Sequence, residues 1–302
     1  MKLLYEMQRH MPTHWNRNNH MFVLDGNWSF KDRLKGHALV IYAQELCDIP
    51  RIIQEVQTPT IIHAIVYENL FCSLASIDID SSWGNTPIIL RIGRIGQYRD
   101  IANKLEQLKS LNVMIVLPAD SSQSYRDVQI LSSLGIHSGI DFTNGCHTWE
   151  SFKDLLAYAF YGRMHHADIE PFTSMSTHYC GMNYVSPDIM SFYNPERYIH
   201  IDNNGNVAFS REQLKNGDFF DSGWDILPNI SSHPAIKEES HKWQQLFIEN
   251  HTCTYCPAFR VCKAFFMGQS ENGSCQDGMM DLLEAIEFKK VEQSNRIQSC
   301  QL

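Results

Sequence analysis

An alternation of short apolar runs and amphipathic segments, between residues 60 and 172, is the feature that most constrains the fold of this chain. The runs at residues 88–92 and 113–117 predict strands, and between them Ile101 and Leu105 begin a set of apolar residues at helical spacing. Strands that alternate with helices form parallel sheets, because each helix carries the chain back across one face of the sheet. The alternation therefore predicts an α/β fold with a curved or partly closed parallel sheet.

Two further units continue the alternation. A helix capped by Ser122 or Ser124 precedes a strand expected at residues 140–142, and a helix opened by Thr148 precedes a strand expected at residues 167–170. Together the units have the size of a partial (βα) barrel.

The pattern then changes to longer loops and a hairpin. Its strands are expected at residues 197–201 and 207–209, joined by a turn that ends at Gly205. Helices are expected at residues 233–250 and 279–293. Since the first 60 residues show no clear period, we expect three parts. These are an N-terminal region of unclear role, a partial barrel and a small cysteine-rich domain, at residues 1–60, 60–175 and 176–302.

Charge and hydropathy exclude several classes of partner. The net charge of -9 and the sequence pI near 5.8 disfavour nucleic acid, because phosphate neutralisation requires a basic excess. The most apolar stretch, residues 61–77, is interrupted by His63, Glu68 and Asn69, which is unsuited to a membrane span. The N-terminus has no apolar signal-peptide core, so we expect a cytoplasmic protein. There, clustered cysteines indicate a metal or redox site rather than disulfides.

Four of the nine cysteines lie within 23 residues at the spacing C-x2-C-x5-C-x12-C: Cys253, Cys256, Cys262 and Cys275. A C-x2-C turn lets two sulfurs reach one metal, and two further thiolates complete a tetrahedral zinc shell or the four corners of an iron-sulfur cubane. The spacing predicts a four-thiolate site and leaves zinc and iron-sulfur both open. His251 is a candidate nitrogen ligand, and free buried thiols are the alternative without a metal.

This segment resembles the SPASM domain at the C-terminus of radical SAM enzymes that mature peptides. In that family a G-x4-C hairpin, a C-x2-C-x5-C-x3-C motif and a last cysteine contribute to holding two auxiliary four-iron clusters. Cys253, Cys256, Cys262 and Cys275 match the four positions that ligate one of them. The resemblance therefore implies one 4Fe-4S cluster held by these four residues, with zinc as the alternative.

The chain departs from the family at the other auxiliary cluster. The position four after Cys262 is Phe266, and the position five after the hairpin Gly205 is Ser210, where the family has cysteines. Cys180 lies upstream of the hairpin at a distance long for the family, and we assign it no metal.

A larger departure is the absence of the C-x3-C-x2-C motif that holds the S-adenosylmethionine cluster of radical SAM enzymes. Cys47, Cys72 and Cys146 are too far apart in sequence to replace it, and no Gly-Gly-Glu is present to bind the methionine amino group. Over about residues 60–290 the chain resembles the pseudo-radical-SAM proteins that accompany genuine radical SAM maturases.

This resemblance implies a catalytically silent iron-sulfur protein that handles a ribosomally made precursor peptide beside an active radical SAM partner. Residues 1–60 would then be a remnant of a leader-peptide-binding domain or the opening elements of the barrel. Two alternatives stay open: a zinc-stabilised α/β interaction module, and an electron-transfer component of a radical SAM maturase.

Three acidic residues follow or end predicted strands, the position where parallel sheets place functional groups: Asp120, Asp141 and Glu170. They could bind a peptide amine or an arginine, although such residues more often cap helices or bond loop backbone.

Overall fold

The computed structural model describes residues 20–26, 28, 30–56, 61–180, 184–267 and 274–299. It is an α/β structure with a ten-stranded, mostly parallel sheet in the order β10-β9-β8-β1-β2-β3-β4-β5-β6-β7, compatible with a partial barrel. The predicted α/β class is therefore confirmed. No helix in the described part of the chain combines the length and the apolar content that a membrane span requires.

The strands are β1 (Met21–Asp25), β2 (Ala38–Ala43), β3 (Ile61–Ser73), β4 (Ile88–Arg94), β5 (Val113–Pro118), β6 (His137–Asp141), β7 (Ile169–Glu170), β8 (Tyr198–Ile201), β9 (Asn206–Ala208) and β10 (Asp221–Ser222). The α-helices are α2 (Asp48–Glu55), α3 (Tyr98–Ala102), α4 (Leu105–Ser110), α5 (Ser122–Ser133), α6 (Trp149–Tyr161), α7 (Phe172–His178), α8 (Arg211–Asn216), α9 (Pro234–His241), α10 (Gln245–Ile248), α11 (Phe259–Cys262) and α12 (Ser274–Ser299).

The chain forms two compact units, each built from two segments. The first unit comprises Met1–Val116 with Phe192–Lys242, and the second comprises Leu117–Ser191 with Trp243–Leu302. The predicted cysteine site lies wholly within the second unit.

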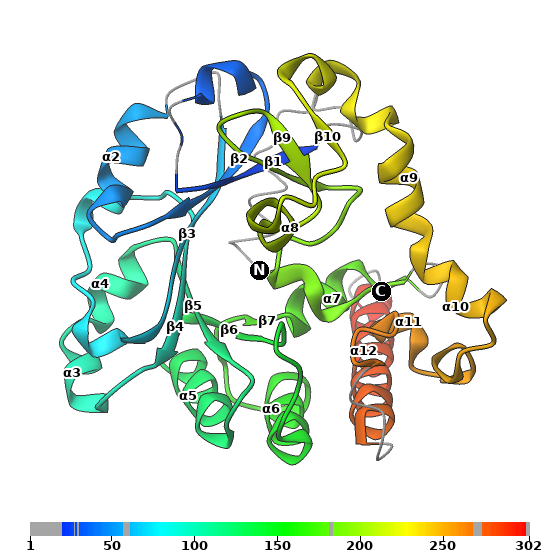
Figure 1. The fold of residues 1–302 in the computed structure, drawn as a ribbon. Coiled ribbons are helices and arrows are strands. Elements are labelled where there is room, and N and C mark those ends of the chain that lie inside the picture. Colours follow the sequence, from blue (N-terminus) through cyan, green and yellow to red (C-terminus); the bar gives the residue numbers. More distant parts are fainter. Residues whose placement is uncertain are drawn as a thin grey trace. The chain divides into compact units, whose positions relative to one another are not determined.

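In the first unit, β8, β1, β2, β3 and β4 pair in parallel, while β9 pairs antiparallel with β8. Figure 1 shows α2, α3 and α4 on one side of strands β2 to β4. Within the first 60 residues, the described part supplies β1, β2 and α2. The described residues of this region are therefore opening elements of the sheet, and residues 1–19, which were the other part of that prediction, lie outside the described residues.

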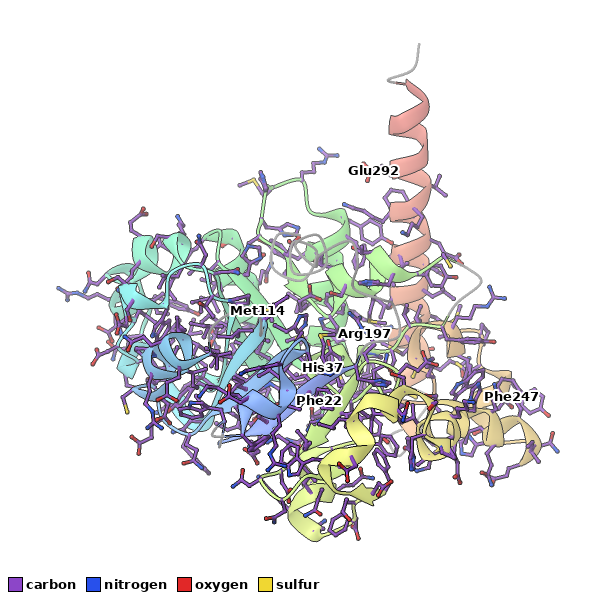
Figure 2. All side chains as sticks on the ribbon, turned by 90° about the horizontal axis from the view of Figure 1, so that it is seen from above. Phe22, His37, Met114, Arg197, Phe247 and Glu292 are labelled. Atoms are coloured by element: carbon purple, nitrogen blue, oxygen red, sulfur yellow. The ribbon has the colours of Figure 1, made fainter. Side chains whose placement is uncertain are left out.

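These two early strands carry no visible period because both of their faces are covered. All six residues of β2 are buried, so its sequence is a continuous apolar run too short to be distinguished from a helical segment. Phe22 of β1 is fully buried and makes an edge-on contact with His37, with ring centroids 4.8 Å apart (Figure 2).

In the second unit, α5 packs against β6 and α6, α6 packs against α12, and aromatic side chains fill part of the core. Phe152 of α6 contacts Phe142 and Phe172, with ring centroids 5.8 and 5.5 Å apart. Gly278 lets α12 approach α6 closely, because a Cβ atom at this position would lie 2.4 Å from the Trp149 ring. Figure 1 shows α12 as one long helix.

Most predicted elements are confirmed, with local differences. The cap of α5 is Ser121, one residue before the predicted position, and its hydroxyl accepts a hydrogen bond from the Ser124 amide at 3.3 Å. Strand β6 begins at His137 rather than at residue 140, since Ser138 is buried and bonds the Val128 carbonyl instead of water. The helix predicted at residues 233–250 is divided into α9, a 3-10 turn and α10.

Candidate metal centre

The first two cysteines lie on a tight turn, a 3-10 helix at Thr252–Tyr255. The Cys256 amide donates to the Cys253 carbonyl at 3.1 Å, which closes the C-x2-C turn. His251 caps this turn, since its Nδ1 atom accepts a hydrogen bond from the Cys253 amide at 3.1 Å. The ring nitrogen nearest the turn is therefore used by the backbone, which disfavours His251 as a ligand through that atom.

The third cysteine ends α11, and the chain then reverses through two strained residues. Lys263 and Ala264 have φ angles of 49° and 60°, the left-handed region that residues with a Cβ rarely adopt. The Phe265 amide donates to the Cys262 carbonyl at 2.9 Å across this reversal. Two consecutive left-handed residues cost about 1–3 kcal/mol each and persist where the surroundings impose them, often at functional sites.

All four predicted cysteines line one hollow in the second unit. The hollow has about 310 Å³ of space, its open mouth included, and each of the four residues is half-buried. Its other walls are largely apolar: Phe259, Ala264, Phe266, Met267, Gln276 and Met279. The structure thus brings together residues that are up to 22 positions apart in the sequence.

The surroundings of the thiols oppose ionisation. Burial raises the pKa of Cys253, Cys262 and Cys275, that of Cys262 to about 12. A second cause at Cys253 is the proximity of Cys275 and Cys256, because neighbouring thiolates would repel one another. In the opposite direction, the backbone amides of Phe265 and Phe266 point to the Cys262 sulfur and lower its pKa.

A cation in the hollow would favour the ionised form of the thiols, because a bound metal deprotonates the thiols that coordinate it. Four soft thiolate donors suit zinc and iron-sulfur clusters and are poorly suited to magnesium or calcium. The donor set therefore fits either of the two predicted metals.

The four thiols are neighbours in the hollow. Among the described residues, no group of three or more His, Cys, Asp or Glu side chains is already placed to hold a metal ion. The thiols instead line the wall of the hollow, close enough for their charges to interact.

The two positions where the family has further cysteines have structural roles here. Phe266 is 2% exposed, and its ring packs against Phe142 and Trp149 at centroid distances of 5.6 and 5.1 Å. Ser210 caps α8, accepting a hydrogen bond from the Gln213 amide at 3.1 Å. Gly205 occupies the predicted hairpin turn with a φ of 82°.

The three acidic candidates bond their own neighbourhoods. Asp120 accepts a hydrogen bond from the Ser124 hydroxyl at 3.3 Å, and Asp141 accepts one from the Thr143 amide at 2.9 Å. Glu170 is buried and accepts one from the Ser174 amide at 3.1 Å. Each carboxylate thus bonds a helix start or a loop, which was the alternative that the sequence analysis gave to ligand binding.

Comparisons with models of protein families, with curated proteins and with solved structures found no match. The four thiols and their surroundings are therefore the basis for the function proposed below.

Sequence reasoning did not predict a second cluster of charged side chains, in the first unit. Asp25, Glu68, Arg91 and Arg211 form an ion network that joins β1, β3, β4 and α8. The available signal was Glu68 and Arg91, two charged residues in the middle of β3 and β4.

Proposed function

We propose that this chain binds one 4Fe-4S cluster through Cys253, Cys256, Cys262 and Cys275 and acts as a catalytically silent partner of a radical SAM maturase. The observation that carries the metal site is that these four residues line one hollow. The peptide-maturation role rests on the resemblance described above.

A cluster and a single zinc ion require different positions of the four sulfurs. Zinc needs all four sulfurs about 2.3 Å from one point. In a cubane each thiolate binds its own corner iron, so the four sulfurs stand further apart around a larger body. The resemblance to the SPASM domain implies the second arrangement, and the two arrangements differ in the metal and sulfide that the chain would contain.

The expected role of the cluster is to hold its own segment together. Between His251 and Met267 few residues are buried, and the Tyr255 side chain is 74% exposed. A segment with so little apolar burial gains stability from a metal that joins its ends. When bound, such a cluster can also exchange one electron, which keeps the electron-transfer role as the second candidate.

The absence of C-x3-C-x2-C from the sequence supports the proposed silence toward S-adenosylmethionine. We expect the reconstituted chain alone to leave this compound intact, as measured by release of 5′-deoxyadenosine under reduction. Stoichiometric release would contradict the proposed silence without bearing on the metal site.

The metal itself is tested by anaerobic purification followed by an ultraviolet-visible spectrum and iron, sulfide and zinc analysis. We expect about four irons and four sulfides per chain, with broad visible absorption. The variant Cys256→Ala should lose them. Cys72→Ala is the matched control, because Cys72 is also half-buried but lies in β3.

One zinc per chain, with no visible absorption, would show that the four thiolates hold a structural zinc ion in place of a cluster. This result would favour the zinc-stabilised interaction module. Full metal content in Cys256→Ala, or equal loss in Cys72→Ala, would overturn the assignment of ligands.

A further inference from the structure

The apolar walls of the cysteine hollow differ in their exposure to solvent. Phe259, Phe266 and Met279 are buried and form its interior. Met267 lines the same hollow but is 43% exposed, which makes it the most exposed apolar residue among those that line it. A side chain that both lines a hollow and is exposed lies where the hollow meets solvent. Met267 is therefore the apolar side chain at the mouth of the hollow.

The strained reversal after α11 is what brings Met267 there. Lys263 and Ala264, the two left-handed residues, turn the chain directly after Cys262. The ring of Phe266 then enters the packed core, and the Met267 amide donates to the Ala264 carbonyl at 2.9 Å. The reversal thus divides two successive side chains, one into the core and the next to the mouth of the hollow.

The rest of the wall is fixed by packing. Cys275, Gln276 and Met279 come from α12, which packs against α11 in the second unit (Figure 1). Met279 is buried, so its replacement would remove a core side chain. Met267 is exposed, and a change there alters the mouth of the hollow with little effect on the core.

An apolar side chain at the mouth of a metal site has a physical consequence. The hydrophobic shell around a metal controls how easily solvent reaches it. Release of a thiolate-bound metal requires the thiolates to exchange it for protons or for a competing ligand, and both arrive through solvent. An apolar side chain between the metal and solvent therefore slows this exchange.

We propose that Met267 is a shielding residue of the metal site, whose side chain covers the mouth of the hollow and slows release of the metal. This inference rests on the proposed metal site and adds to it a residue that does not bind the metal. The shielding comes from the apolar volume of the side chain, so the thioether sulfur is not required for it.

The test is the rate of metal release from the full-length, metal-loaded chain. Excess EDTA is added under anaerobic conditions, and the iron or zinc that stays on the chain is measured at intervals after desalting. Met267→Ala should begin with the metal content of the wild type and lose it about tenfold faster. Since either metal can be followed in this way, the test does not depend on which one the chain holds.

Two variants serve as controls. Met267→Leu keeps the apolar volume without the sulfur, so it should release metal as slowly as the wild type does. Met164→Ala removes a methionine that is 77% exposed, in the second unit but outside the hollow, and should also behave as the wild type does. The denaturant midpoint of Met267→Ala should equal that of the wild type, which separates shielding from a general loss of stability.

A second measurement applies to an iron-sulfur cluster. Reduction adds a negative charge, which water stabilises better than an apolar wall does. Met267→Ala should therefore raise the reduction potential measured by spectroelectrochemistry, and Met267→Leu should leave it unchanged. A lower potential in Met267→Ala would contradict the proposed shielding.

Equal release rates in Met267→Ala and the wild type would overturn this inference and leave the metal site in place. Equal acceleration in Met164→Ala, or an acceleration in Met267→Leu as large as that in Met267→Ala, would do the same. A wild-type chain that holds no metal would overturn the proposed function together with this inference, so the two failures are distinguishable.

Discussion

The strands of the first unit and the cysteine segment at residues 251–267 differ in how much apolar burial is available to hold them in one conformation. All six residues of β2 are buried, among apolar neighbours on both sides. In the cysteine segment the buried residues are four, Ala258, Phe259, Val261 and Phe266.

Burial of apolar surface stabilises by about 25 cal/mol per Å², so the strands hold their conformation through packing alone. The cysteine segment buries too little for this. It also contains two consecutive left-handed residues, Lys263 and Ala264, whose strain must be offset by another interaction. The contrast indicates that packing specifies the first region, and it is consistent with the proposal that a metal cross-link specifies the second.

The largest expected effect is that of metal removal. Structural metal sites contribute binding free energies on the order of 10 kcal/mol to the fold that they join. Chelation under anaerobic conditions should therefore abolish amide protection at residues 251–267 and leave β2 protected. Hydrogen exchange with mass spectrometry measures both regions in one sample, and unchanged exchange at residues 251–267 would contradict the contrast.

The second-largest expected effect is that of truncating a buried side chain in the sheet. Ile41 of β2 is fully buried, so Ile41→Ala should lower the free energy of unfolding by about 2–5 kcal/mol. Denaturant unfolding measures this value. Tyr255→Ala, at a side chain exposed to solvent, is the control and should change it by no more than about 0.5 kcal/mol. Similar losses in both variants would show that packing matters equally in the two regions.

A pH effect should follow from His63 of β3, which is buried and has no partner for Nε2 among the described residues. Burial, and secondly the charge of Arg197, lowers its pKa to about 4. Between pH 6.5 and 4 the unfolded chain therefore binds a proton that the folded chain does not, and stability falls as the pH falls. At pH 5 the loss is about 2 kcal/mol.

The measurement is denaturant unfolding at pH 7.5 and pH 5.0. His63→Leu should lose less stability over this interval than the wild type, by about 2 kcal/mol. His241→Leu, at an exposed position of α9, should behave as the wild type does. An equal pH dependence in all three proteins would rule out a role for His63.

The smallest effect concerns Ser210, where the family has a cysteine. Since its hydroxyl caps α8, Ser210→Ala should cost about 1 kcal/mol of stability. Metal content should not change, because the four cysteines of the hollow do not include this position. Loss of iron in this variant would place Ser210 in the metal site and remove the distinction between the two regions.

Much of the fold could be predicted because its signals are local. The apolar run of β4, the helix after Thr148 and the turn at Gly205 depend on residues within a few positions of one another. The cysteine spacing is local in the same sense, so its four residues could be singled out before their arrangement was known.

Other features depend on which strands become neighbours. The early strands β1 and β2 have no period because both faces are covered, a condition that the tertiary structure creates. At Phe266 the resemblance to the SPASM domain led to the expectation of a cysteine, and the structure shows that an aromatic ring fills a packed position there.

By itself, the sequence determined the α/β class, most of the individual elements and the set of four cysteines. The tertiary structure alone decided that these cysteines share one hollow and that Arg211 meets Asp25 and Glu68, 186 and 143 positions earlier in the chain. The physical reason is the range of the interactions. Periodicity and short spacing are set along the chain, whereas a hollow or an ion network exists only after strands and helices have packed.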